Sequence, residues 1–420
     1  MHEFDVVLLA NSPHARTHVL GLSLVERGWR VAERAGAKRV YIVDSVAAAN
    51  DLRAWSESSS ALVVMRAGDQ VVHKPLIESL LGGTSQRRIA FGTDGKFAGA
   101  MWASGPAVKE AVDAILAAPK NADEELRQRW QDSAESVTHG DISRHPATTP
   151  AEQRGAVQMM LRILIKKEDN PVTKYCYRPL SRPLTRLLVH TPITPNQISY
   201  LVGILGLLGC YLTALPSQAS LIWGASIIFF AGVLDGCDGE IARLKLISTP
   251  FGAWLDTIVD EITTTAYYVA IACHMYAHYP RAWIGWSIPI GALLLIASIY
   301  VIYYFCIVVA KVGGSQFYVG TLELVEGPRG WGLREKKRAQ TIKSPLLRML
   351  GRWGMYMKTR DFINLAALFL TFINAYEVIY TGMLVGTIVT ALFVLPDHVR
   401  LRVQLRELAR RGGSPYLVVS

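Results

Sequence analysis

Hydrophobic and polar residues alternate on a short scale in the first part of the chain. The apolar run FDVVLLA (4–10) is followed by a helical pattern, and further strand-like runs lie at 38–44 and 61–69. RRIAFGTD and FAGAMWA add two more strand-like pieces, and KPLIESLLGG and GPAVKEAVDAILAA have helical spacing. Strands alternating with helices predict an α/β domain with a largely parallel sheet over residues 1–120.

The next segment changes character twice. Residues 121–171 are polar and charged and predict a linker with two short helices. Residues 172–194 carry a basic residue at every fourth position from Lys174 to Arg186, with leucines between them, which predicts an amphipathic elbow helix beside anionic lipid. Pro179 and Pro183 favour a short or broken helix. A solvated helix face is the alternative. It is the weaker interpretation because an apolar span follows directly.

Long apolar runs dominate the rest of the chain. Several approach the roughly 20 residues that a bilayer core requires. They predict an all-α membrane domain over residues 195–400 with six transmembrane helices, followed by a tail at 401–420. The expected spans are about 196–214, 220–235, 252–274, 282–310, 362–377 and 378–398.

Charge predicts the orientation of these spans. The net charge is +10, with no long basic tract of the kind that binds nucleic acid. Connections near 215–219 and 374–380 lack Lys and Arg, whereas the elbow, the 311–360 loop and the tail are basic. The positive-inside rule therefore places both termini in the cytoplasm, in an inner-membrane protein. No signal peptide precedes the first strand, and the five cysteines have no CxxC spacing, which is typical of core residues.

Four aspartates interrupt the apolar sequence between Leu234 and Asp260. Asp235 and Asp238 are three residues apart and Asp256 and Asp260 are four apart, so each pair shares one face of a helix. Two such pairs, where the second span ends and the third begins, would build a cytoplasm-facing cage of oxygens for Mg²⁺, Mn²⁺ or Ca²⁺. Carboxylates are costly inside a membrane, which by itself indicates a function.

Three other interpretations of these acids remain open. Aspartates can cap helices for purely structural reasons. An ion-coupled transporter also uses intramembrane acids, although it usually places them on broken helices near the bilayer middle. A catalytically silent membrane scaffold is the third possibility.

The spacing of these residues resembles the pattern D-x2-D-G-x2-A-R-x8-G-x3-D-x3-D of the CDP-alcohol phosphotransferase family. The resemblance covers residues 172–400, including the elbow and the TPNQIS entry to the first span. It implies a transferase of phospholipid or polar-headgroup synthesis that moves a phosphoalcohol from a CDP-alcohol to an acceptor hydroxyl, releases CMP, and acts as a homodimer. The matching positions are Asp235, Asp238, Gly239, Ala242, Arg243, Gly252, Asp256 and Asp260.

The resemblance also assigns roles to individual residues. It implies that Asp235, Asp238, Asp256 and Asp260 bind Mg²⁺ or Mn²⁺ as two ions, and that Asp260 is also the catalytic base. CDP would contact Gly239 and Arg243, together with Thr249, Asn196 and Ser199. The donor alcohol stays open between diacylglycerol and a polar alcohol such as inositol, so lipid is either the donor or the acceptor.

Basic residues around the last two spans suggest an acceptor site. Lys358 and Arg360 lead into the fifth span and Arg400 closes the sixth, where they would suit a phosphorylated acceptor. The alternative is ordinary positive-inside charge at the lipid surface.

The N-terminal domain resembles sugar nucleotidyltransferases in its first strand, in the helix and strand of GLSLVERGWRVAERAGAKRVYIVD (21–44), and in Asp69 at the end of a central strand. Active members have a glycine-rich loop after the first strand, whereas this chain has ANSPHART. His14 and Arg16 could contact phosphate, but a surface loop is the simpler interpretation. The resemblance implies a catalytically inactive domain, with Asp69 not expected to bind metal, in a layout similar to inositol-phosphate cytidylyltransferase / di-inositol-phosphate-phosphate synthases.

Overall fold

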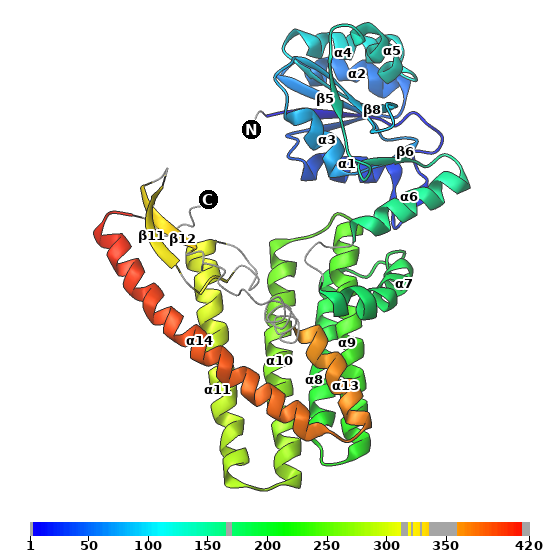
Figure 1. Ribbon diagram of the computed structural model, residues 1–420. Helices are drawn as coiled ribbons and strands as arrows, with labels where there is room; N and C mark the ends of the chain where they lie inside the picture. The colour runs from blue at the N-terminus through cyan, green and yellow to red at the C-terminus, as the bar shows by residue number, and fades with distance from the viewer. Residues whose placement is uncertain are drawn as a thin grey trace. The chain divides into compact units, whose positions relative to one another are not determined.

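The computed structural model divides into two compact units (Figure 1). Unit 1 comprises Met1–Glu168, Leu184–Pro192 and Glu240–Ile247, and unit 2 comprises Asp169–Pro183, Ile193–Gly239 and Ser248–Ser420. The residues that the structure describes are 3–164, 170–311, 318–320, 322–327, 330–335 and 359–413.

Unit 1 is built on a six-stranded sheet with the order β4-β1-β5-β8-β7-β9. β1 pairs in parallel with β4 and β5, but β8 runs antiparallel to both β5 and β7. The α/β prediction is confirmed, whereas the sheet is mixed rather than largely parallel. The strands are β1 (Asp5–Leu9), β4 (Val40–Val43), β5 (Ala61–Arg66), β7 (Arg87–Phe91), β8 (Phe97–Ser104) and β9 (Glu135–Thr138).

The antiparallel pair has a local cause. β7 and β8 are joined by a tight turn in which Gly92 N donates to Lys96 O and Gly95 has a φ of +73°. An Asp-Gly pair, here Asp94 and Gly95, is a strong signal for a hairpin because glycine adopts positive φ without steric cost. A hairpin connection requires its two strands to be antiparallel.

Helices cover both faces of this sheet. Along β1, Val6 and Leu8 pack into one core and Val7 and Leu9 into the other, as the period of two dictates. The first core is completed by α1 (Leu24–Arg34) and α3 (Lys74–Leu81). The second is completed by α2 (Val46–Ser56), α4 (Pro106–Ala117) and α5 (Ala122–Trp130).

Residues 121–164 of the segment expected to be a linker, 121–171, supply structure to unit 1. β9 pairs in parallel with β7, and β10 (Arg144–Pro146) pairs with β6 (Gln70–Val72). α6 (Pro150–Ile163) begins at a capping box formed by Thr149 and Glu152. The two predicted helices, LRQRWQDSAESV and AVQMMLRILIKK, overlap α5 and α6, but the first was extended into β9. Both strands were missed because their short polar sequences lack an alternating apolar pattern.

Two short segments from later in the chain complete unit 1. Val189 and Leu244 join a core with Leu20 of the hairpin formed by β2 (His18–Val19) and β3 (Leu22–Ser23). The ammonium of Lys245 donates to the carbonyl of Thr191 at 2.8 Å. Unit 1 is therefore assembled from three separate parts of the sequence.

His73 is expected to make unit 1 sensitive to acid. Burial, and secondly the neighbouring Arg27 guanidinium, lowers the pKa of His73 to about 4, against about 6.5 for an exposed imidazole. The folded state thus binds fewer protons, and the stabilisation present above pH 6.5 is lost as pH falls toward 4. We expect the melting temperature of the full chain to fall less between pH 7 and pH 5 in His73→Gln than in wild type. His18→Gln, at an exposed position, should keep the wild-type dependence, and equal falls in all three proteins would contradict the assignment.

Unit 2 is a bundle of long helices with one hairpin. A π-helical turn, η1 (Thr173–Tyr177), leads into α7 (Arg178–Leu188), whose last residues belong to unit 1. The hairpin consists of β11 (Leu322–Gly327) and β12 (Gly330–Glu335). The bundle helices are α8 (Pro195–Ala214), α9 (Gln218–Leu244), α10 (Pro250–His278), α11 (Ala282–Phe305) with the turn η2 (Cys306–Ala310), α13 (Arg360–Phe372) and α14 (Tyr376–Arg410).

Four helices of the described chain are long and apolar enough to cross a membrane: Pro195–Ala214, Gln218–Leu244, Ala282–Ala310 and Tyr376–Arg410. Their outward surfaces are apolar, since Ile204, Leu293 and Phe393 are each 66% exposed. Such exposure would be unfavourable in water and is expected in lipid. The chain is an integral membrane protein.

The basic residues of the elbow do not share one exposed face. Lys174 and Arg186 are exposed, but Arg178 is buried, as are Ser181 and Thr185 on the same side of α7. The Thr185 hydroxyl donates to Glu240 at 2.6 Å. The polar side of α7 therefore packs inward, while Leu180 and Leu187 are exposed. A four-residue repeat identified the helix but not which of its polar residues pack against protein.

Candidate functional site

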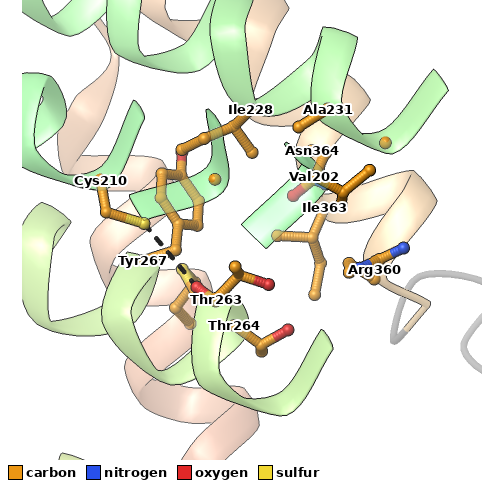
Figure 2. Close-up of a pocket in the computed structure, with 13 residues that line it drawn as sticks. Val202, Cys210, Ile228, Ala231, Thr263, Thr264, Tyr267, Arg360, Ile363 and Asn364 are labelled. Atoms are coloured by element: carbon orange, nitrogen blue, oxygen red, sulfur yellow. Dashed lines mark hydrogen bonds between the residues drawn. The ribbon is translucent and has the colours of Figure 1, made fainter. Parts of the chain in front are cut away.

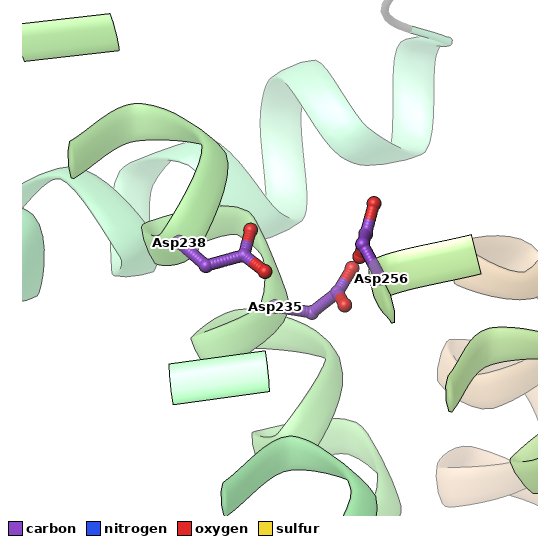
Figure 3. A group of neighbouring side chains, drawn as sticks. All are labelled: Asp235, Asp238 and Asp256. Carbon is purple, nitrogen blue, oxygen red and sulfur yellow. The ribbon is translucent and has the colours of Figure 1, made fainter. Parts of the chain in front are cut away.

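Three of the four predicted metal ligands converge between α9 and α10 (Figure 3). Asp235 and Asp238 project from α9 and Asp256 from α10, and each offers one oxygen within 4.8 Å of the others. Asp238 is buried and the other two are half-buried. Clustered carboxylate oxygens are hard ligands that suit Mg²⁺ or Mn²⁺, and the close approach of like charges favours a cation between them. The donor set fits a divalent ion.

The start of α10 is fixed by its own sequence. Thr249 is the N-cap, its hydroxyl accepts from Gly252 N at 3.0 Å, and Pro250 occupies the first turn. A methyl group at Gly252 would lie 2.8 Å from Asn196 Oδ1, so glycine lets α10 approach the beginning of α8. Thr249 and Asn196, both predicted to contact CDP, therefore lie next to Gly252 at the N-terminus of α10.

Ser199 orients one of the acids. Its hydroxyl donates to Asp238 Oδ2 at 2.6 Å, across the packed surfaces of α8 and α9, and both side chains are buried. A hydrogen bond of this kind holds a ligand in one rotamer and so reduces the cost of arranging it around an ion.

Ser199→Ala is expected to weaken Mg²⁺ binding by about tenfold, which is the lower end of effects seen when a group supporting a metal ligand is lost. Thermal unfolding in a Mg²⁺ titration would measure the change. Ser226→Ala is the matched control, because Ser226 donates to Ile222 O within its own helix, at 2.7 Å. Equal Mg²⁺ affinities for the two variants would show that Ser199 does not orient Asp238.

Asp260 is held beside the cluster by Arg360. The guanidinium of Arg360, in the first turn of α13, donates to Asp260 Oδ1 and to Asp235 Oδ2. The sequence suggested Arg360 only as a contact for acceptor phosphate. The structure places it between two acids of the motif, 100 and 125 residues away in sequence.

The remaining predicted site residues are more dispersed. Gly239 lies in α9 directly after Asp238, and Arg243 lies in the last turn of the same helix. Arg400, on α14, pairs with Asp397 at 3.1 Å. Lys358 lies outside the described residues. Cys237 is buried, with Sγ 3.5 Å from the carbonyls of Ser181 and Val233, so it acts as a packing residue.

A small cavity adjoins the site (Figure 2). It has a volume of about 40 Å³, enough for a few water molecules. Arg360 and Asn364 of α13 line it opposite Thr263 and Tyr267 of α10. The Tyr267 hydroxyl is buried and has no hydrogen-bond partner among the described residues. Buried hydroxyls are usually satisfied, so water in this cavity would supply the missing partner.

Sequence reasoning missed two acids near the cluster. Glu261 accepts from Tyr303 OH at 3.0 Å, and Asp361 accepts from the hydroxyl of Thr173. Asp361 directly follows Arg360 and also lies in the first turn of α13, where a negative charge is favourable. The sequence signal was the charged pair Arg360 and Asp361, which begins an otherwise apolar helix. The contact of Asp361 with Thr173 on η1 depends on tertiary packing and has no such signal.

The N-terminal residues suggested by sequence lie in ordinary structural settings. Arg66 lies 3.5 Å from the Asp69 carboxylate and also binds Asp123. Burial raises the pKa of Asp69, an effect that Arg66 partly offsets. The loop with His14 and Arg16 closes through hydrogen bonds between its own backbone groups, and Arg16 is exposed.

Comparison with known proteins finds a family match over the segment that carries these acids. Residues 192–394 match the family described as CDP-alcohol phosphatidyltransferase. The match covers the segment in which the spacing of the acids predicted a resemblance to this family.

Individual relatives carry related names. A bifunctional IPC transferase and DIPP synthase of Rubrobacter xylanophilus is 30% identical over 220 residues, covering 48% of this chain and 49% of the relative. A phosphatidylinositol phosphate synthase of Corynebacterium glutamicum is 33% identical over 108 residues, covering 25% and 48%. A CDP-diacylglycerol–glycerol-3-phosphate 3-phosphatidyltransferase of Haemophilus influenzae is 27% identical over 170 residues, covering 40% and 77%. The chain spans about half the length of the first two relatives.

Proposed function

We propose that this protein transfers a phosphoalcohol from a CDP-alcohol to an acceptor hydroxyl and releases CMP. The observation that carries the proposal is the convergence of Asp235, Asp238 and Asp256, at family motif positions, within 4.8 Å. A pyrophosphate carries several negative charges, so an alcohol can approach it only where those charges are neutralised. Helix capping would not require carboxylates from two helices to converge, so a purely structural role explains this arrangement less well.

In this proposal Asp235, Asp238, Asp256 and Asp260 hold Mg²⁺ or Mn²⁺, most simply as two ions. Bound there, the ions would neutralise the pyrophosphate and stabilise the leaving oxygen. Ser199 keeps Asp238 in position, and Gly252 lets Asn196 and Thr249 lie close together. The nucleotide contacts assigned to Gly239, Arg243, Thr249, Asn196 and Ser199 belong to the same proposal.

Asp260 takes the proton in the transfer step. The acceptor oxygen bonds to the β-phosphorus, its proton passes to the Asp260 carboxylate, and the bond from that phosphorus to the CMP oxygen breaks. Arg360 contacts Asp260 and is placed to bind a phosphate near the reacting atoms. Lys358 and Arg400 would add to this positive charge for a phosphorylated acceptor.

The membrane arrangement we propose has six spans. α10 and α13 would join the four helices that meet the criteria of length and apolarity. α10 has 29 residues, long enough to span the bilayer. Both termini and the acid cluster would face the cytoplasm, with α7 at the headgroup level near anionic lipid, and the chain would form a homodimer.

The domain order we propose begins with a nucleotidyltransferase-like domain without catalysis at residues 1–120. The linker at 121–171 and the elbow at 172–194 join it to the membrane domain at 195–400. A cytoplasmic tail follows at 401–420.

The donor can be identified directly. The purified full chain is incubated with Mg²⁺ and either CDP-diacylglycerol or CDP-inositol, in lipid vesicles that contain candidate acceptors, and CMP is measured. We expect CMP from one donor, dependent on both the acceptor and Mg²⁺. Failure to produce CMP from a full panel of CDP-alcohols would reject the function.

An ion-coupled transporter is the competing function, because acids and an arginine lie within apolar helices. It predicts ion-coupled flux in proteoliposomes and no nucleotide binding. The transferase predicts instead that CDP protects the protein against unfolding only when Mg²⁺ is present. The location of Asp256 and Asp260 within the first eleven residues of α10 favours the transferase, since transporter sites usually lie near the bilayer middle.

A further inference from the structure

Arg360 joins two acids that belong to different helices. Its Nη2 donates to Asp235 of α9 and its Nη1 to Asp260 of α10, so the two arms of the guanidinium hold the two halves of the motif together. Its side chain is 21% exposed, and those of Asp235 and Asp260 are 19% and 35% exposed. Because the three side chains are partly buried, these two contacts are stronger than surface ion pairs.

Asp235 takes part in two arrangements. Its Oδ2 accepts from Arg360, and it also contributes an oxygen to the cluster with Asp238 and Asp256. The four aspartates have a formal charge of −4, which one guanidinium reduces to −3. Arg360 therefore neutralises only part of the site, and strong attraction for a divalent cation remains. A cation bound to the same carboxylates would repel the guanidinium at short range.

We propose that Arg360 and a divalent cation compete for Asp235 and Asp260, so that cation binding releases the guanidinium. This inference rests on the proposed metal site and adds an exchange of cations within it. The released guanidinium stays at the start of α13, where it can turn to a phosphate group. Release also frees Asp260 Oδ1, which Arg360 occupies. The exchange therefore couples metal loading to exposure of both the base and a phosphate-binding group.

The test measures Mg²⁺ binding without any substrate. Calorimetry and thermal unfolding of the full-length protein would compare wild type, Arg360→Met and Arg360→Lys. Methionine removes the charge, whereas lysine keeps the charge but lacks the planar fork that spans two carboxylates. Arg334→Met is the matched control, since Arg334 pairs with Glu323 at 2.6 Å on the β11–β12 hairpin and contacts neither aspartate in the described structure.

Competition predicts that both Arg360 variants bind Mg²⁺ more tightly than wild type, by about tenfold for Arg360→Met, within the usual range for coupled binding events. Their melting temperatures without Mg²⁺ should fall, and Mg²⁺ should raise them more than it raises that of wild type. Arg334→Met should keep the wild-type affinity. Wild-type affinity in Arg360→Lys would overturn the exchange. The tighter binding of Arg360→Met would then follow from the loss of a nearby positive charge, without competition for the carboxylates. No saturable Mg²⁺ binding in any of the proteins would instead reject the metal site on which the inference rests.

Discussion

Asp260→Asn is expected to lower the rate of CMP release from a CDP-alcohol by about 10³-fold, within the range for loss of a general base. The amide matches the carboxylate in size and can still accept from Arg360, but it cannot take the proton of the acceptor hydroxyl. The folded state should therefore survive while proton transfer fails. Initial rates at saturating Mg²⁺, together with the melting temperature, would measure both properties.

Glu261→Gln is the control for Asp260→Asn. Glu261 is the next residue of α10, but its carboxylate accepts from Tyr303 and it lies outside the motif. We expect this variant to keep CMP release within a few-fold of wild type. Full activity in Asp260→Asn would remove Asp260 from the role of base.

Asp256→Asn is expected to weaken Mg²⁺ binding by about 100-fold, since Asp256 is half-buried and the loss of a charged partner costs about 3 kcal/mol, the lower end of the range for buried pairs. Asp256 is the only member of the three-carboxylate cluster contributed by α10, so its loss leaves two acids on a single helix. Activity should return partly as Mg²⁺ is raised, because the ligand is weakened while the base is kept.

The Mg²⁺ response separates this variant from Asp260→Asn, whose rate should stay low at every Mg²⁺ concentration. Rates measured across a Mg²⁺ titration of both variants provide the comparison. If Asp256→Asn kept the wild-type Mg²⁺ dependence, the cluster would not be the metal site.

The sequence was sufficient to predict the arrangement of the acids within each helix. A separation of three or four residues places two side chains on one helix face whatever the tertiary structure, so Asp235 and Asp238 could be paired in advance. The long apolar runs likewise predicted α8 and α11 with close boundaries, whereas α9 continues to Leu244, beyond the expected end of its span at 235. Local periodicity is informative in these cases because the membrane imposes regular backbone hydrogen bonding.

Features that depend on contacts between distant residues were not predictable. Arg360 lies 100 residues beyond Asp260, and no local pattern reveals that its guanidinium reaches back to both α9 and α10. The burial of Arg178 depends on how α7 packs, which a repeat of basic residues does not specify. The pairing of β9 with β7 is equally non-local, since Glu135–Thr138 has no alternating apolar pattern of its own.

The fate of the β-phosphorus of the CDP-alcohol tests the central claim most directly. The purified protein would be given a CDP-alcohol labelled at that phosphorus, its acceptor and Mg²⁺, and the products separated. The account predicts the label in the acceptor product, unlabelled CMP in equal amount, and neither product when Mg²⁺ is chelated. Label remaining with the nucleotide, or released as a free alcohol phosphate regardless of acceptor, would contradict it.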